Sequence, residues 1–421
     1  MENTNKDMER VILVAVEDER SAVSAEESLD ELEELVRTAG AEASDKLIQK
    51  REAVHPGHYI GKGKLDELKD LIALHGATGI VCDDELRPGQ IRRMSEILET
   101  KIMDRTMVIL DIFASRASSA EGKAQVELAQ LKYRLSHLSG LGKILSRLGG
   151  GIGTRGPGEK KLETDRRHIR ERVNDLQREL KEIRLRRGIQ REKREKNNIP
   201  VISLAGYTNA GKSTLMNLLT NAGVLEENKL FATLDTTTRR IKLKGGTEAL
   251  ITDTVGFIRK LPHSLIEAFR ATLEEMSYAD ILIHVADASN PAREAQVKSV
   301  YDTLKELKCL DKPIITVFNK MDKEVETPLP ADKIARAALP LSARTGEGAD
   351  ALLDKLEEII NSLKKRVTVC IPYSEGRLVS LIHDKCEVLR EEHTENGTLI
   401  EIYASDEIYS RVEKYIDYTI V

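Results

Sequence analysis

The chain has 421 residues, carries a net charge of −5, and is 40% hydrophobic, 32% charged and 4% aromatic. This length predicts about three domains, and the composition is typical of a folded protein rather than a disordered one. The sequence has no apolar run of the roughly 18 residues that a membrane-spanning helix needs, and its polar, acid-containing start is not expected to be a secretory signal. The four scattered cysteines argue against a disulfide framework or a structural zinc site, so we expect a reducing compartment, the cytoplasm; they are Cys82, Cys309, Cys370 and Cys386.

The first 120 residues alternate short apolar runs with helical patterns. Strands are expected at 10–16, 79–84 and 106–113, and helices at 28–40 and 88–98. This alternation predicts an α/β domain over residues 1–120. The GKGK sequence at 61–64 is a poor candidate for a phosphate loop, because no apolar strand leads directly into it and no Ser or Thr follows its second lysine.

Residues 121–197 carry two apolar seams with helical spacing. The first seam has intervals of 3, 4 and 3, and the second has intervals of 4, 3, 4 and 3. Two such helices joined by a loop are expected to pack as an antiparallel hairpin. The seam residues are Leu128, Leu131, Leu135 and Leu138, followed by Ile169, Val173, Leu176, Leu180 and Ile183.

The loop between these helices, residues 140–159, contains eight glycines together with Lys143, Arg147 and Arg155. The following stretch, 160–196, has 15 Lys/Arg against 8 Asp/Glu although the whole chain is acidic. The loop is either a flexible connector or a tip whose bare backbone approaches phosphates while its basic side chains neutralise them. The arginines favour the second interpretation, so we expect a nucleic-acid partner.

A phosphate-binding motif begins at residue 206. GYTNAGKS fits GxxxxGK[ST] and lies between an apolar strand and a helix, which is the context this motif requires. Lys212 is expected to reach the β- and γ-phosphates of a nucleotide, and the Ser213 hydroxyl to bind Mg²⁺. The predicted nucleotide-binding residues here are Gly206, Tyr207, Thr208, Asn209, Ala210, Gly211, Lys212, Ser213 and Thr214.

A DxxG sequence follows about 40 residues later, at the end of an apolar strand. Asp253 is expected to hold the magnesium shell through water, and Gly256 to present its N–H to the γ-phosphate. Thr254 and Val255 between them are included in the predicted site. The intervening sequence LFATLDTTTRR offers several threonines that could bind Mg²⁺ and sense the γ-phosphate, and composition does not choose among Thr233, Thr236, Thr237 and Thr238.

The sequence NKMD comes directly after another apolar strand. The Asp322 carboxylate can accept hydrogen bonds from both N1–H and the 2-amino group of guanine, whereas adenine leaves it unpaired. Asn319 and Lys320 are expected to brace the base and the phosphate loop, and the backbone N–H of Ala343 to meet guanine O6. The predicted base-binding residues are Asn319, Lys320, Met321, Asp322, Ser342, Ala343 and Arg344.

The order and spacing of these motifs predict a GTP-hydrolysing enzyme of the α/β class. Residues 198–365 are expected to form a P-loop GTPase domain with a mostly parallel sheet and the nucleotide at the carboxyl edge of its strands. It is preceded by the α/β domain and the helical hairpin, and followed by a small α+β domain, residues 366–421, with strand–helix–hairpin–helix order. We expect a monomer with GTP as substrate and Mg²⁺ as cofactor.

Further motifs resemble those of the HflX family of TRAFAC-class GTPases. These are RGPGE (155–159), FATLD (231–235), DTVGF (253–257) and LPHSLIEAF (261–269). The resemblance implies that Thr233 is the magnesium-binding threonine, that Lys212, Thr233 and Gly256 act in catalysis, and that the FATLD residues contact GTP: Phe231, Ala232, Thr233, Leu234 and Asp235. It also implies binding to the large ribosomal subunit and its rRNA through the hairpin loop 140–159, and splitting of ribosomes under heat or antibiotic stress.

Two positions depart from expected patterns. Phe257 follows DTVG where Ras-type GTPases have a water-orienting glutamine, so intrinsic hydrolysis is expected to be slow. Thr236 stands where many relatives are expected to have proline. Three alternatives stay open: a ribosome-assembly GTPase, a nucleotide-gated ribosome-binding module with little hydrolysis, and a P-loop kinase or ATPase, which NKMD opposes.

Overall fold

The structure is a computed structural model that describes residues 8–17, 24–138, 157–195, 199–220, 230–231, 236–260, 273, 275–325, 329–363, 365–404 and 406–416. The chain divides into two compact units. One comprises Met1–Arg184, Glu226–Asp235 and Val255–Leu273, and the other comprises Leu185–Leu225, Thr236–Thr254 and Glu274–Val421. Two short segments from the middle of the chain therefore pack with its N-terminal part. Among the described helices, none has both the length and the hydrophobicity to span a bilayer.

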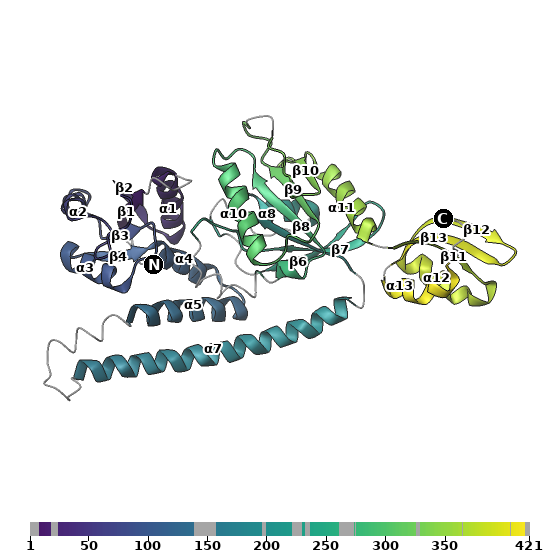
Figure 1. Cartoon of the computed structure of the whole chain (residues 1–421), viewed down its shortest axis with the longest axis horizontal. Coiled ribbons are helices and arrows are strands. Elements are labelled where there is room, and N and C mark those ends of the chain that lie inside the picture. The colour runs from purple at the N-terminus through teal and green to yellow at the C-terminus, as the bar shows by residue number, and fades with distance from the viewer. Residues whose placement is uncertain are drawn as a thin grey trace, which may run out of the picture. The chain divides into compact units, whose positions relative to one another are not determined.

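The first unit contains a four-stranded parallel sheet of order β2-β1-β3-β4 (Figure 1). One face of this sheet packs on α2 and α3 through an apolar cluster that includes Ile12, Val14, Leu68, Ile80 and Met94. The predicted α/β class of the N-terminal part is confirmed. Its elements are β1 Arg10–Glu17, α1 Ala25–Ala39, β2 Glu42–Lys50, α2 Lys62–His75, β3 Gly79–Cys82, α3 Pro88–Leu98, β4 Lys101–Asp104 and α4 Arg105–Arg116.

The expected strand at 106–113 is wrong, because these residues form α4. The strand of this region is the short β4, which directly precedes the helix. Asp104 ends β4 and caps α4, since its carboxylate accepts a hydrogen bond from the backbone N–H of Met107 at 2.9 Å. The helix buries most of its circumference, and such a helix has the same continuous apolar run as a buried strand. The sequence also gave no sign of β2, whose largely polar residues are only half-buried.

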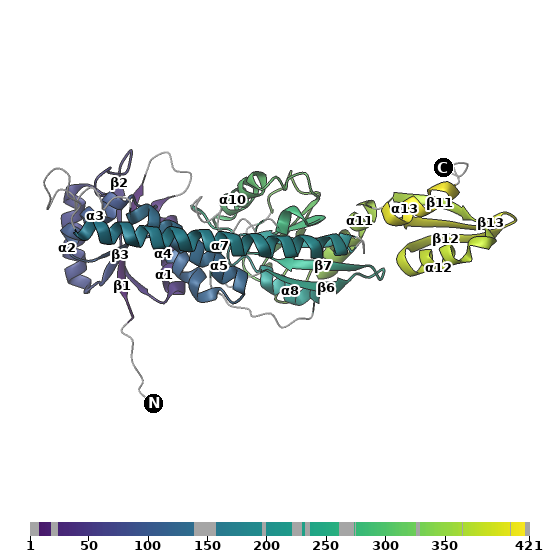
Figure 2. The same cartoon turned by 90° about the horizontal axis from the view of Figure 1, so that it is seen from below.

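The predicted antiparallel hairpin is formed by α5, Ala120–Leu138, and α7, Pro157–Glu195, which lie side by side in both views (Figures 1 and 2). Their shared apolar seam contains Ala124, Leu128, Val173, Leu176 and Leu180. Across the seam, the guanidinium of Arg172 donates two hydrogen bonds of 2.7 Å to the carboxylate of Glu127. Most of the predicted loop at 140–159 lies outside the described residues.

The second unit contains a six-stranded sheet of order β10-β9-β8-β5-β7-β6. Only β6 pairs antiparallel, so the predicted mostly parallel sheet is confirmed. Helices α8, α10 and α11 pack on it (Figure 1). The elements are β5 Val201–Gly206, α8 Lys212–Thr220, β6 Thr237–Lys242, β7 Glu248–Asp253, β8 Ile281–Asp287, α10 Arg293–Glu306, β9 Ile314–Asn319, β10 Ala337–Pro340 and α11 Ala349–Leu363.

The chain ends in a three-stranded antiparallel sheet of order β11-β13-β12 with its own small core, which includes Val369, Ile371, Ile382, Ile400 and Ile402. The predicted strand–helix–hairpin–helix order is confirmed, with the hairpin turning before Gly397. A Cβ on this glycine would lie 2.2 Å from the Ile371 carbonyl oxygen, so no larger residue fits. The elements are β11 Lys365–Ile371, α12 Gly376–Lys385, β12 Glu387–Thr394, β13 Gly397–Ala404 and α13 Asp406–Val412.

Candidate functional site

The phosphate-loop sequence forms a tight turn between β5 and α8. Gly206 ends the strand, and a Cβ there would lie 2.3 Å from the Val285 carbonyl oxygen. Gly211 has φ +95°, and a Cβ on it would lie 2.2 Å from Nδ2 of Asn319. Only glycine therefore allows the loop to lie this close to β8 and to the NKMD segment. The turn delivers the chain to the N-terminus of α8, where backbone N–H groups and the helix dipole favour an anion.

Lys212, the first residue of α8, points back over this loop. Its ammonium donates hydrogen bonds to the carbonyl oxygens of Gly206 at 3.1 Å and Tyr207 at 2.8 Å. Burial lowers the pKa of Lys212 to about 8, against the opposing effect of the Asp253 carboxylate. A phosphate in the loop would favour the charged form of the amine. The position thus suits an anionic ligand electrostatically.

Ser213 and Asp253 are brought together by the pairing of β5 with β7. The Ser213 hydroxyl donates to Oδ2 of the fully buried Asp253 at 2.8 Å. Thr254, also buried, donates to the Leu204 carbonyl at 2.6 Å and so fixes the end of β7 to β5. A hydroxyl beside a carboxylate is an oxygen-rich pair of the kind that Mg²⁺ prefers. These residues could hold the ion directly through Ser213 and through water at Asp253.

The loop also contains a polar atom that lacks a hydrogen-bond partner within the described part of the chain. Oγ1 of Thr208 is buried, and no described group lies within hydrogen-bond distance of it. A buried hydroxyl of this kind costs free energy unless a ligand or water pairs with it. Phosphate oxygens would supply such a partner.

Asn319 connects the phosphate loop to the two base-recognition segments. Its amide donates to the Ala210 carbonyl at 2.8 Å, and its side-chain oxygen accepts from the backbone N–H of Ala343 at 2.9 Å. Next to it, the Lys320 ammonium pairs with Asp287 at the end of β8 at 2.7 Å. Three loops that are far apart in sequence are therefore held by one buried side chain.

Asp322 is positioned by the SAR sequence that follows β10. The Ser342 hydroxyl donates to Oδ1 of Asp322 at 2.7 Å, and Arg344 lies 3.9 Å from Oδ2. The hydrogen bond from Ser342 is the main cause that lowers the pKa of the Asp322 carboxyl, against the opposing effect of burial, and the nearby cations add to it. The side chain is therefore an ionised acceptor at neutral pH, oriented from behind by Ser342.

The structure thus brings the phosphate loop 206–214, Asp253–Thr254, NKMD and the SAR residues together within the second unit. Seven predicted site residues do not belong to this group. Ala232, Thr233, Leu234 and Asp235 are outside the described residues. Phe231, Val255 and Gly256 belong to the first unit, where the Phe231 ring packs edge-on against Phe113 with centroids 4.7 Å apart.

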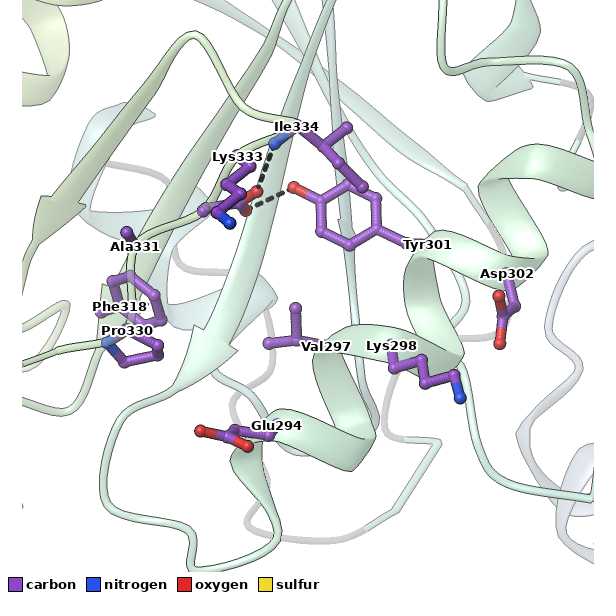
Figure 3. A pocket seen from close by; sticks show the side chains of 11 residues that line it. Glu294, Val297, Lys298, Tyr301, Asp302, Phe318, Pro330, Ala331, Lys333 and Ile334 are labelled. Carbon is purple, nitrogen blue, oxygen red and sulfur yellow. Dashed lines mark hydrogen bonds between the residues drawn. The ribbon is translucent and has the colours of Figure 1, made fainter. Parts of the chain in front are cut away.

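Sequence reasoning missed a buried polar network behind the base-recognition segment. The Asp332 carboxylate accepts hydrogen bonds from Tyr301 and Thr316, both at 2.5 Å, and the Thr316 hydroxyl lies 3.3 Å from Nδ1 of His284. The only signal in the sequence is a histidine within the apolar run ILIHVAD. The network closes one side of a pocket of about 420 Å³ between α10 and residues 330–334, in which the Tyr301 hydroxyl points toward residues 332–334 (Figure 3). The pocket shares only Phe318 with the strand that carries NKMD, so it is distinct from the nucleotide site.

The network makes the second unit sensitive to acid. Burial lowers the pKa of His284 to about 4, against the opposing effect of Asp332. Because an unfolded histidine has a pKa of about 6.5, the unfolded state binds a proton that the folded state does not, and stability falls as the pH drops from about 6.5 toward 4. We expect a loss of about 2 kcal/mol between pH 7 and pH 5 from this residue. Calorimetric unfolding measures this, and the transition of the second unit is identified as the one that moves when nucleotide is added.

In the His284→Gln variant that pH dependence should shrink, whatever the absolute stability, while His168→Gln on the exposed face of α7 should keep it. Equal pH dependence in wild type and His284→Gln would show that another group is responsible.

Three family profiles match successive parts of the chain. They are described as GTP-binding GTPase N-terminal over residues 26–114, GTP-binding GTPase Middle Region over 116–194, and 50S ribosome-binding GTPase over 201–320. Together they span more than half of the sequence. The last one covers the phosphate loop, Asp253 and the start of NKMD.

Individual relatives align along almost the whole chain. A protein of Lacrimispora saccharolytica named GTPase HflX is 54% identical, with 97% of this chain and 96% of the relative covered. A GTPase HflX of Caldanaerobacter subterraneus subsp. tengcongensis is 47% identical, with 99% and 96% covered. A solved structure described as SsGBP and GDP complex aligns with a TM-score of 0.46 and 25% identity over 85% of this chain and 99% of that chain. The identity and coverage of the two sequence relatives, with the matched profiles, show that this chain belongs to the HflX family of GTPases.

Proposed function

We propose that this GTPase binds the large ribosomal subunit and uses GTP to separate stalled ribosomes into subunits. The observation that carries the proposal is the match of residues 201–320 to the family described as 50S ribosome-binding GTPase. The charge of α7 supports it independently, because most of its described basic side chains are exposed, among them Arg167, Arg170 and Arg178. Such a surface suits the phosphates of rRNA. We further propose that loop 140–159 contacts rRNA and that the protein acts in the cytoplasm as a monomer.

We propose roles for the site residues that follow from their positions. Lys212 and the loop N–H groups bind the β- and γ-phosphates, while Asp322 reads the guanine edge from its place against Ser342. Asn319 keeps these two parts at a fixed separation. Gly256 donates its N–H to the γ-phosphate, and Thr233 and the remaining FATLD residues contact GTP.

Mg²⁺ fits the donor set of this site. Ser213 would bind it directly together with Thr233, and Asp253 through water. When bound, the ion neutralises charge on the β- and γ-phosphate oxygens. The Ser213 hydroxyl can act as a magnesium ligand because the Asp253 carboxylate beside it orients it.

The hydrolytic step lacks a water-orienting group at the position after Gly256. Phe257 is 2% exposed and packs within the first unit, and its side chain cannot hydrogen-bond to water. We therefore expect slow GTP turnover by the protein alone, and at least about a tenfold increase when purified large subunits are added, because the ribosome fixes the switch segments or supplies the missing group. Steady-state phosphate release measures this. Small subunits are the control, and equal turnover with and without large subunits would refute the expectation.

The function itself is tested by light scattering of intact ribosomes. Addition of the protein with GTP should lower the scattering as subunits separate, whereas GDP should not. Unchanged scattering with intact GTP binding would favour the ribosome-assembly alternative. Separation by a non-hydrolysable GTP analogue in a single round would favour the nucleotide-gated binding module, in which hydrolysis only times release.

We also propose that the chain divides into four parts: the N-terminal α/β domain 1–120, the helical hairpin 121–197, the GTPase domain 198–365 and the small α+β domain 366–421.

A further inference from the structure

The carboxyl edge of the N-terminal sheet is arranged like a ligand site. In the order β2-β1-β3-β4, the connection from β1 leads to one side of the sheet and the connection from β3 to the other, so a topological switch point lies between β1 and β3. Open α/β sheets bind their ligands outside the strand ends at this point. Asp83 and Asp84 follow β3 directly at this edge. The segment that follows Gly256 contacts both aspartates.

Lys260 contacts both of these aspartates. Its ammonium binds the buried carboxylate of Asp83 and donates to Oδ1 of Asp84 at 2.7 Å. The other oxygen of Asp84 accepts from the Tyr59 hydroxyl at 2.7 Å. Burial disfavours the ammonium, but the two carboxylates outweigh it and raise the pKa of Lys260. Lys260 adopts φ +52°, a left-handed conformation that a non-glycine residue keeps only where its surroundings hold it.

Arg105 fixes the backbone of the same segment. The residue is 1% exposed, and its guanidinium donates through Nη1 to the Arg259 carbonyl at 3.0 Å. The same group donates to Glu31 at 2.6 Å and through Nη2 to Asp83 at 3.0 Å. Asp83 therefore accepts from Arg105 on one oxygen and from Lys260 on the other, with a further bond of 2.8 Å from Ser28. The buried charges are thus mutually paired.

The segment is also held by apolar burial close to Gly256. Val255, Phe257 and Ile258 are 5%, 2% and 3% exposed. The residues on either side of Gly256 are therefore buried, and the ionic contacts follow within four positions. Between residues 255 and 260 the chain has little conformational freedom left.

We propose that Asp83, Asp84 and Arg105, together with Lys260, form a switch clamp that holds the segment around Gly256 in one conformation and so positions its N–H for the γ-phosphate. The inference rests on the proposed role of Gly256. GDP has no γ-phosphate, so its binding free energy does not depend on this segment. GTP contacts the segment, and its affinity is lower if binding has to order a loose chain. A clamp that orders the segment beforehand therefore strengthens GTP binding selectively.

The test is Lys260→Met in the full-length protein, because Asp83 keeps Arg105 and Ser28 as partners and the side chain of Lys260 is 42% exposed. Binding of GDP and of a non-hydrolysable GTP analogue is measured by calorimetry. Affinity for the analogue should fall about tenfold, with GDP affinity within about twofold of wild type. Hydrogen exchange of the amides at 255–260 should become faster.

Lys308→Met is the matched control, since Lys308 also has a left-handed backbone, φ +56°, but lies in the other unit. It should change neither affinity. Asp84→Asn should reproduce part of the loss, and combining it with Lys260→Met should add little, because both remove the same contact. A ratio of analogue to GDP affinity that is unchanged or increased in Lys260→Met would overturn the clamp. If wild-type protein fails to bind the analogue at all, the proposed function fails instead.

Discussion

Replacing Lys212 by alanine should weaken binding of both GTP and GDP by at least about a hundredfold. The ammonium is expected to make charge-assisted hydrogen bonds to the phosphates, each of which contributes about 1.5–3 kcal/mol. The change also removes the bonds to the Gly206 and Tyr207 carbonyls, which leaves the phosphate loop less ordered. The lost phosphate contacts and the less ordered loop both lower the affinity for nucleotide. Calorimetric titration in the presence of Mg²⁺ measures the two affinities.

The matched control is Lys305→Ala, which removes an exposed lysine from α10 in the same unit. It should leave both affinities within about twofold of wild type. Circular dichroism should show the same helix content for the two variants. Retention of wild-type GTP affinity by Lys212→Ala would show that the GKS sequence is not the phosphate site.

Some parts of this molecule could be predicted from sequence because the information is local. The phosphate loop and NKMD each lie within eight residues and follow an apolar strand, so sheet topology alone brings them to one edge. The hairpin was predictable because its seam repeats with helical spacing. By contrast, 106–113 has no periodicity that separates a helix buried all round from a buried strand. The capping residue Asp104 is what distinguishes a helix from a strand here, and we identified it as a cap from the structure rather than from the sequence.

The contacts that the sequence did not reveal join residues far apart in the chain. Asp83 meets Lys260, and His284 meets Thr316, across elements that local patterns do not relate. No local pattern in the sequence marks the charges of Asp83 and Arg105 as buried, whereas the fold buries both and pairs them. Buried ion pairs of this kind are poor evidence of stability but strong constraints on geometry. Both networks lie beside segments that belong to the predicted nucleotide site, which is where a fixed backbone matters most.

Replacing Asp322 by asparagine should exchange guanine specificity for xanthine specificity. The carboxylate accepts two hydrogen bonds from N1–H and the 2-amino group of guanine, and an amide must present its NH₂ group to one of these donors. Xanthine has a carbonyl oxygen in place of the amino group, so the same amide can donate to it. We expect GTP affinity to fall at least about a hundredfold and xanthosine triphosphate affinity to rise, because a mismatched polar group at the base edge costs several kcal/mol.

The contact between Asp322 and Ser342 supplies a control that separates recognition of the base by the carboxylate from orientation of that carboxylate by its neighbour. Ser342→Ala keeps the carboxylate but removes the hydroxyl that orients it at 2.7 Å. Loss of one such bond is expected to weaken GTP binding about fivefold without any gain for xanthine, because the donors and acceptors at the base edge are unchanged. Competition of GTP, xanthosine triphosphate and ATP for a fluorescent guanine nucleotide measures all three affinities in each variant. If Asp322→Asn kept the wild-type order of preference, the base would be read by some other group, and the assignment of NKMD as the guanine-recognition segment would be wrong.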